Sequence, residues 1–342
     1  MPFGWKFSLL NSLLLLAWAY LALLFGWGAA QSLFGDGRGW LFLLNVAAVY
    51  LFIPAPIVLL LGACSRRWSI CALALIACCW WGVLFGKLYL PRSVPPAEGV
   101  AINVMTYNLL YTNQQITAIV AAIDASEADL VALYELHPLH SSAIQRSLTE
   151  EFPYQLLDPQ GIDGAGVISR YPLKLTGETL PGTWIGEPRI YEMDVAGQTI
   201  TIVCAHPYAS HVEMPWKTAP RLAERDRSID SIVKFARSHK GPLIVPLDLN
   251  TTPLNAAYKN MTSVLTDSWQ AAGYGIGHTF PGAASPGSSR PRFAGILMPM
   301  WMIRIDYVFH SHHFITTEAL LAPWDGYSDH RPVMARLVLK AK

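Results

Sequence analysis

Three apolar runs in the first ninety residues place the strongest limit on what this chain can fold into. They are Phe7–Ala30, Trp40–Leu61 and Ser69–Tyr89. Each is about 20 residues long and nearly free of charge, which is the length a helix needs to cross the hydrocarbon core of a bilayer. A signal peptide would explain only the first run, and its apolar part is too long for one. The sequence therefore predicts three transmembrane helices, the second kinked at Pro54 and Pro56.

Charge divides the chain near residue 99. Residues 1–99 hold six Lys or Arg and two acidic residues, a net charge of +4. The remainder holds 19 of the 25 basic and 22 of the 24 acidic residues, a net charge of −3, and all ten histidines. We therefore expect a membrane anchor over 1–90, a proline-rich linker over 91–99 and a polar domain over 100–342.

Basic residues near the apolar runs predict an orientation. Arg66 and Arg67 lie in the short loop between the second and third runs, and Lys6 lies near the N-terminus. Positive loops stay in the cytoplasm, so three spans place residues 100–342 on the extracytoplasmic side of a bacterial-type inner or plasma membrane. Lys87 and Arg92 lie on the side that this rule does not favour.

In the polar part, predicted strands end at polar side chains. The apolar strand Ala101–Tyr107 ends at Asn108, and the strand Asp129–Leu136 carries Glu135 near its end. Between them, Thr112–Ser126 has the apolar spacing of an amphipathic helix. Strand, helix and strand form a β-α-β unit, so both polar side chains should emerge at one edge of a sheet.

Later strands carry further polar side chains, which are His206, Asp248 with Asn250, Asp306, and Asp329 with His330. In the stretch Pro242–Pro253, residues 248 and 250 share one face of an extended backbone, although a strand followed by an Asx turn explains them equally well in isolation. Oxygen ligands with two histidines suit a hard cation such as Mg²⁺ better than Zn²⁺.

Six motifs, in this order, carry a family resemblance: TYN, ALYELH, HPYAS, LDLNTTP, RIDYVF and GYSDHRP. Over roughly residues 100–340 the chain resembles the endonuclease/exonuclease/phosphatase, or deoxyribonuclease I-like, superfamily. The resemblance implies an α/β fold, a four-layer sandwich of two mixed β-sheets flanked by helices. It also implies a metal-dependent phosphoesterase that uses Mg²⁺ or Mn²⁺. With its three preceding apolar runs, the chain also resembles the membrane-anchored teicoplanin-resistance proteins.

The resemblance implies roles for individual residues. The implied metal ligands are Asn108, Glu135 and Asp329. The implied catalytic residues are His206, Asp248, Asn250, Asp306 and His330. Asp248 would orient or deprotonate the attacking water, and Asn250 would bind a phosphoryl oxygen. His330, aligned by Asp306, would contact the phosphate, while His206 would stabilise it or protonate the leaving group.

Two positions depart from the superfamily pattern. Leu247 precedes the aspartate where glycine is usual, so either the backbone is an ordinary strand there or the local geometry has shifted. Tyr134 precedes Glu135 where glutamine is more common. Further substrate-binding candidates are Arg189, His278 and Trp301.

One apolar stretch, Ile296–Ile303, stands directly before the strand of Asp306. It fits a buried strand, and it fits equally a membrane-dipping or acyl-binding wall beside the site.

The net charge of −3 and the short linker favour a lipid phosphate over nucleic acid as substrate, such as a polyprenyl diphosphate, a phospholipid or a sphingolipid headgroup. The expected partner is the lipid bilayer, and no protein partner can be inferred. A membrane-tethered extracytoplasmic nuclease is the alternative. A non-catalytic binding domain is the third candidate, and the complete residue set argues against it.

Overall fold

The computed structural model describes residues 9–36, 39–92, 98–209, 215–282, 290, 292–293 and 296–340. The chain forms two compact units, Met1–Leu90 and Pro91–Lys342. We call them the apolar unit and the polar unit.

The apolar unit is helical. Its elements are α1 (Leu9–Phe34), α2 (Gly39–Val46), α3 (Ala48–Leu51), α4 (Pro54–Cys64), α5 (Trp68–Phe85) and the 3-10 helix η1 (Gly86–Tyr89). Within the described residues, two helices are long and apolar enough to span a membrane, Leu9–Phe34 and Trp68–Tyr89. There are three if the bent pair between them counts as one span.

The middle span is bent at a place the sequence did not predict. The helical axis turns by 74° between Gly39–Val46 and Ala48–Cys64. This bend therefore lies at Ala47, ahead of the prolines, and the helix is interrupted a second time at residues 52–53, directly before Pro54. Pro54 and Pro56 lie in the first turn of α4, where a helix makes no use of the backbone N–H that proline lacks.

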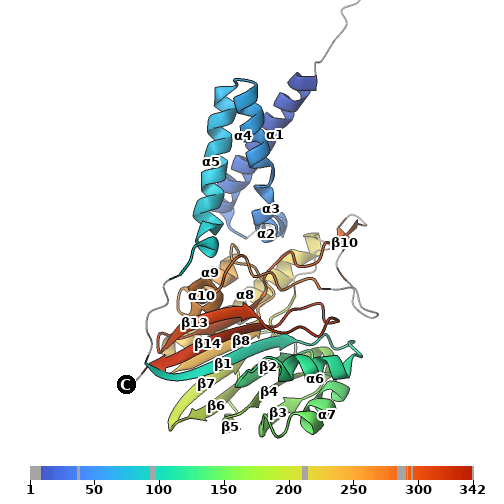
Figure 1. The fold of residues 1–342 in the computed structure, drawn as a ribbon, viewed down its shortest axis with the longest axis vertical. Helices are drawn as coiled ribbons and strands as arrows, with labels where there is room; N and C mark the ends of the chain where they lie inside the picture. Colours follow the sequence, from blue (N-terminus) through green and yellow to red (C-terminus); the bar gives the residue numbers. More distant parts are fainter. Residues whose placement is uncertain are drawn as a thin grey trace, which may run out of the picture. The chain divides into compact units, whose positions relative to one another are not determined.

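The polar unit contains two sheets that, counted over the described residues, have six strands each (Figure 1). The first sheet has the order β13-β14-β1-β2-β4-β3. Its strands are β1 (Gly99–Asn108), β2 (Leu130–Tyr134), β3 (Tyr154–Asp158), β4 (Ala165–Ser169), β13 (Phe314–Leu321) and β14 (Val333–Lys340).

The second sheet has the order β5-β6-β7-β8-β12-β9. Its strands are β5 (Leu173–Leu175), β6 (Arg189–Val195), β7 (Gln198–Cys204), β8 (Leu243–Asp248), β9 (Thr266–Asp267) and β12 (Asp306–His310). A separate ribbon pairs β10 (Arg292–Phe293) with β11 (Ile296–Leu297).

Each sheet is mixed and has a parallel pair joined by a helix. In the first sheet β1 and β2 are parallel and α6 (Ile116–Asp124) connects them. In the second, β7 and β8 are parallel and α8 (Pro215–Ser238) connects them. Parallel neighbours need such a crossover, and a helix is its usual form. We call these the first and second β-α-β halves.

Helices flank the paired sheets. Ile119 and Ile123 of α6 and Ile144 of α7 (Pro138–Ser147) pack into one core with residues of β1, β2 and β4. Helices α8, α9 (Ala256–Thr262) and α10 (Ser268–Ala272) lie on the other side in Figure 1. The predicted four-layer sandwich is confirmed.

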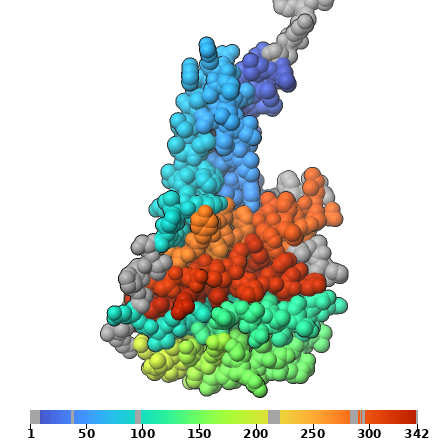
Figure 2. All heavy atoms as spheres, in the orientation of Figure 1, coloured from blue at the N-terminus to red at the C-terminus, as the bar shows by residue number. Residues whose placement is uncertain are grey.

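One edge of the sandwich collects the strand ends that matter for function. Parallel strands end at the same edge, and antiparallel neighbours begin there. Accordingly Asp306 opens β12 directly opposite Asp248, and Val333 opens β14 opposite Thr106. On the surface in Figure 2, the C-terminal strands (red) lie between segments of residues 100–170 (green) and 250–300 (orange).

Three strands and the ends of one helix have no clear signal in the sequence. Strands β3, β5 and β13 were not predicted, and the helix expected over Thr112–Ser126 is shorter, Ile116–Asp124. His310 is buried in β12 and contacts the Thr316 hydroxyl at 2.7 Å.

Candidate active site

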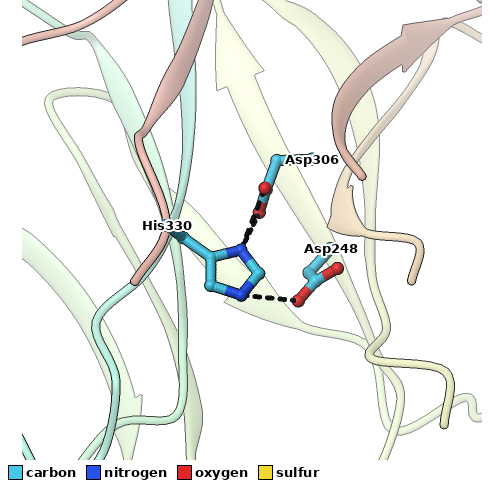
Figure 3. A group of neighbouring side chains, drawn as sticks. All are labelled: Asp248, Asp306 and His330. Carbon is cyan, nitrogen blue, oxygen red and sulfur yellow. Dashed lines mark hydrogen bonds and ion pairs between the residues drawn. The ribbon is translucent and has the colours of Figure 1, made fainter. Parts of the chain in front are cut away.

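A buried histidine lies between two buried carboxylates at this edge (Figure 3). The Nδ1 atom of His330 lies 2.9 Å from Oδ2 of Asp306, and its Nε2 atom lies 3.8 Å from Oδ2 of Asp248. Asp248 and Asp306 come from paired strands of the second sheet, whereas His330 comes from the turn that leads into β14 of the first. The two sheets together therefore build this triad.

The charges of the triad stabilise one another. Burial alone would lower the pKa of His330, but the carboxylates of Asp306 and Asp248 raise it well above its usual value. Burial works to raise the pKa of Asp248, but His330, His206 and Asn108 outweigh it and lower that pKa. Burial and then the charge of Asp248 raise the pKa of Asp306, against the opposing effect of His330. A histidinium between the two carboxylates is the arrangement these shifts favour.

His206 completes the second half of the site. It follows the end of β7, and its Nε2 atom lies 3.4 Å from Oδ2 of Asp248. Its ring packs edge-on against Tyr134, with the ring centroids 5.6 Å apart. The Tyr134 hydroxyl donates a hydrogen bond to the carbonyl of Pro246, so this tyrosine ties β2 of the first sheet to β8 of the second.

Asn108 connects the two β-α-β halves. Its Nδ2 atom lies 3.1 Å from Oε1 of Glu135 and 3.2 Å from Oδ2 of Asp248. Its Oδ1 atom accepts the backbone N–H of Leu110 at 3.0 Å. The side-chain oxygen is thus engaged in the local turn, and the amide group serves as a donor to two carboxylates.

Two residues at this edge have left-handed backbone. Glu135 has φ 53° and Asn250 has φ 52°, a region that few residues other than glycine adopt. Such conformations persist where surrounding contacts fix them, and they cluster at functional sites. Leu247, by contrast, pairs regularly with Tyr307 and is not among the described residues with positive φ. The residue that replaces the usual glycine is therefore in an ordinary strand.

A buried arginine holds Asn250 in place. Arg225 of α8 is fully buried and donates from Nη1 to the Asn250 carbonyl at 3.1 Å. The Asn250 side-chain amide donates to the Pro207 carbonyl at 3.0 Å, and its backbone N–H donates to Oδ1 of Asp248 at 3.0 Å. The stretch beyond β8 is thus fixed from three directions.

The turn that carries Asp329 and His330 is held by Ser328. The Ser328 hydroxyl donates to the Asn108 carbonyl at 2.8 Å and accepts the His330 N–H at 3.1 Å. Asp325 accepts the N–H groups of Tyr327 and Ser328 at 3.0 and 2.9 Å. Burial, and then the charge of Glu135, raises the pKa of the Asp329 carboxyl to about 6, with His330 opposing the shift.

The chemistry of the donor set fits a divalent cation at Glu135 and Asp329. Both carboxylates are partly exposed at the edge, and the negative charge of one disfavours ionisation of the other. A cation would relieve that repulsion, and Mg²⁺ is commonly held by one or two carboxylates with water and substrate phosphate. Asn108, also predicted as a ligand, lies beside Glu135, and its oxygen accepts one N–H, that of Leu110.

A second group with metal-ligand geometry is Asp248, Asp306 and His330, whose ligand atoms lie within 4.8 Å of one another. In this group the His330 imidazole lies between the two carboxylates. Its raised pKa favours the protonated form, whose positive charge offsets their negative charge as a bound cation would. We therefore regard these three residues as an acid–base group.

The three predicted substrate-binding residues lie in different surroundings, and two of them are close to the turn of Asp329 and His330. Arg189 forms an ion pair with Asp158, and no described contact joins it to the triad. His278 lies beside Arg331, which donates to its carbonyl. Burial lowers the pKa of the His278 imidazole to about 4. Trp301 packs edge-on against Trp324, 5.0 Å between ring centroids, beside the turn of Asp329.

Comparisons with known proteins agree with this geometry. Residues 105–330 match the model of the Endonuclease/Exonuclease/phosphatase family. A comparison with curated protein sequences gave no match.

Solved structures share the fold at low identity. An endonuclease/exonuclease/phosphatase family protein from Bacteroides thetaiotaomicron is 15% identical, with a TM-score of 0.53 over 71% of this chain and 100% of that chain. TDP2 from D. rerio, humanized by 14 mutations, is 14% identical, with a TM-score of 0.54 over 69% and 98%. D. rerio TDP2 complexed with single strand DNA product gives the same values.

Proposed function

Because the chain belongs to the endonuclease/exonuclease/phosphatase family, whose members are metal-dependent phosphoesterases, we propose that it hydrolyses a phosphate ester or diphosphate of a membrane lipid. The observation that carries the proposal is the buried carboxylate of Asp248, which faces His206 and His330 at the edge where Glu135 and Asp329 emerge. Hydrolysis of a phosphoric ester needs a nucleophilic oxygen, a neutralising cation and a proton donor, and this edge offers a candidate for each.

We assign Asp248 to the attacking water. Its lowered pKa keeps it ionised near neutral pH, and the Asn108 amide fixes one of its oxygens while the Asn250 N–H fixes the other. A carboxylate held in this way can orient a water and accept its proton as the water attacks phosphorus in line.

We assign the two histidines to charge and proton transfer at the phosphate. His330 is kept protonated by Asp306, so its Nε2–H can stabilise charge on the phosphoryl oxygens. His206, whose Nε2 atom also lies near Oδ2 of Asp248, is our candidate for the donor of a proton to the departing oxygen. The side-chain amide of Asn250 is our candidate for a further donor to phosphate.

Glu135 and Asp329 would hold a divalent cation, Mg²⁺ or Mn²⁺, which supplies positive charge to the phosphoryl oxygens. Asn108 would orient Glu135 through its hydrogen bond. Among the remaining candidates, His278 and Trp301 lie beside the turn of His330 and are our assignment for substrate contacts, and Arg189 is the more distant one.

The lipid assignment rests on the apolar helices of the same chain and on the net charge of −3 over residues 100–342. We propose that residues 1–90 anchor the enzyme and that its catalytic domain, residues 100–342, faces the extracytoplasmic side. A nuclease is the second candidate, because D. rerio TDP2, a structural neighbour, is complexed with single strand DNA product.

The test is a parallel assay of the full chain with Mg²⁺ on a polyprenyl diphosphate, a phospholipid, a sphingolipid and single-stranded DNA. We expect turnover of a lipid phosphate and little of DNA. The variant His330→Ala serves as a background control, because it removes the charge between the two carboxylates. Turnover of DNA alone would replace the lipid proposal by the nuclease, and equal turnover by His330→Ala would refute the assigned site.

A further inference from the structure

An accessible apolar surface adjoins the proposed active site. The segment Ile296–Ile303 contains seven apolar side chains and one proline, and none of them is buried. Ile296 is 73% exposed and Met300 is 46% exposed. The expectation of a buried strand is therefore wrong for this segment. A run of this kind on a protein surface marks an interaction site more often than chance. We call residues 296–301 the apolar rim.

The rim is joined to the turn of the catalytic histidine. The Trp301 N–H donates to the Pro281 carbonyl at 2.8 Å. A Cβ atom at Gly282 would lie 2.8 Å from Cη2 of Trp301 and 2.8 Å from Cα of Asp329, so the indole lies next to the Asp329 backbone. The Arg331 guanidinium lies 4.3 Å from the centre of the Trp301 ring. Anything bound to the rim is therefore beside the site.

Trp301 is held in place at the end of the rim. It has φ 58°, a left-handed conformation that a bulky side chain adopts only at a cost. Its indole packs edge-on against Trp324, and the Arg331 guanidinium lies over its ring. The rim side chains that precede it, Ile296 and Met300, are exposed.

The composition of the rim fits a bilayer better than a nucleic acid. Residues 296–303 carry no charged side chain that could pair with a phosphodiester backbone. Aliphatic side chains with a tryptophan and a nearby arginine are typical of the membrane interface, where the arginine reaches headgroup phosphates.

The same chain carries helices that could hold it in a membrane. In its described part, two or three helices are long and apolar enough to span a bilayer. Only residues 90–98 separate the last of those helices from β1, and nine residues extend over about 32 Å at most.

We propose that the apolar rim, Ile296–Trp301, enters the interfacial layer of the bilayer that holds the apolar helices, and so brings the active site to lipid headgroups. The rim makes this contact whether or not a lipid is the substrate. Only the consequence for turnover rests on the proposed function.

The contact is tested without turnover by photocrosslinking. The full chain with Met300→p-benzoylphenylalanine is reconstituted in phosphatidylcholine and phosphatidylglycerol nanodiscs and irradiated, and adducts are identified by mass spectrometry. The matched control is Tyr154→p-benzoylphenylalanine, a 39% exposed position in β3 at the opposite edge of the first sheet. We expect phospholipid adducts at position 300 and not at 154. No lipid adducts at 300, or equal yields at both positions, would overturn the proposal.

The consequence for turnover is tested with Ile296→Ser combined with Met300→Ser. On a phosphate ester embedded in nanodiscs we expect at least a tenfold lower rate, because two apolar side chains no longer enter the bilayer. On a water-soluble phosphodiester the rate should stay within twofold of wild type. Tyr154→Ser should leave both rates unchanged. Equal loss on both substrates would show a defect of the site and overturn the proposed role.

The two tests separate this proposal from the proposed function. Lipid adducts at position 300 without turnover of any lipid phosphate would retain the rim and reject the lipid substrate. Turnover of a lipid phosphate without lipid adducts at position 300 would reject the rim and retain the lipid substrate.

Discussion

The two β-α-β halves of the polar unit have the same topology but supply different chemistry. The first half ends at Asn108 and Glu135, and the second ends at His206 and Asp248. Glu135 is partly exposed, and within the part of the chain that the structure describes its carboxylate accepts from two neutral donors, the Asn108 amide and the Tyr111 N–H. Asp248 is buried and lies between two imidazoles. An accessible carboxylate without a cationic partner suits a metal ion, whereas a buried one beside histidines suits proton transfer.

The largest effect should come from the second half. Asp248→Asn removes the proton acceptor while keeping the shape, so kcat should fall by about 10³-fold or more with little change in KM. Steady-state kinetics on the substrate found in the panel give both values. Added Mg²⁺ or Mn²⁺ should not restore the rate. If added metal restored the rate of Asp248→Asn, Asp248 would be a metal ligand, and the roles assigned to the two halves would be reversed.

The first half should respond to metal instead. Glu135→Gln should lower kcat/KM by about 10²-fold at low Mg²⁺, with part of the loss recovered at high Mg²⁺. A second readout needs no substrate: Mg²⁺ should raise the melting temperature of wild type, since a ligand that binds only the folded state stabilises it. It should not do so for Glu135→Gln. An equal rise in both proteins would exclude Glu135 as the ligand.

A smaller effect is expected at the support of the second half. Arg225→Met leaves the Asn250 carbonyl without its buried donor, which costs about 1–3 kcal/mol of unfolding free energy. If the guanidinium also positions Asn250, kcat should fall about tenfold at unchanged KM. Asp226→Asn is the control, because it alters the neighbouring ion pair but keeps the bond to Asn250. Lower stability with unchanged kcat would leave Arg225 a purely structural role.

The smallest effect should come from the hydrogen bond between the sheets. Tyr134→Phe removes the donor to the Pro246 carbonyl and should lower the unfolding free energy by about 1 kcal/mol. Chemical denaturation measures this change, with Tyr154→Phe as the exposed control. The rate should change less than threefold, since the hydroxyl contacts no reacting group. A loss of rate as large as that of Arg225→Met would mean that the packing between the halves controls the chemistry directly.

Four polar residues of the site were accessible from the sequence because they end or follow apolar strands: Asn108, Glu135, His206 and Asp248. The β-α-β pattern alone places Asn108 and Glu135 at one edge, and the same reasoning holds for His206 and Asp248. Some strands were not accessible. Three residues in β5 are too few for a period, and the edge strand β13 groups its polar residues at 316–318 instead of alternating them with apolar ones.

The supporting residues could not be predicted either, because their partners are distant in the chain. Arg225 and Asn250 are 25 residues apart, and Ser328 and Asn108 are 220 apart. The exposure of the apolar rim could not be predicted for a different reason. Hydrophobicity predicts that Ile296–Ile303 is covered, but it does not say whether protein or lipid covers it.

The amide of Asn108 has only two N–H hydrogens, and each faces a carboxylate of a different half. Both N–H groups of this amide are used, so a shift of either half, or a change of its carboxylate, alters the hydrogen bonding of the other. Although the halves look like interchangeable modules, a chimera that joined one of them to the corresponding half of a distant relative would leave this amide with one misplaced acceptor. The halves of this enzyme must therefore be inherited, and engineered, as a pair.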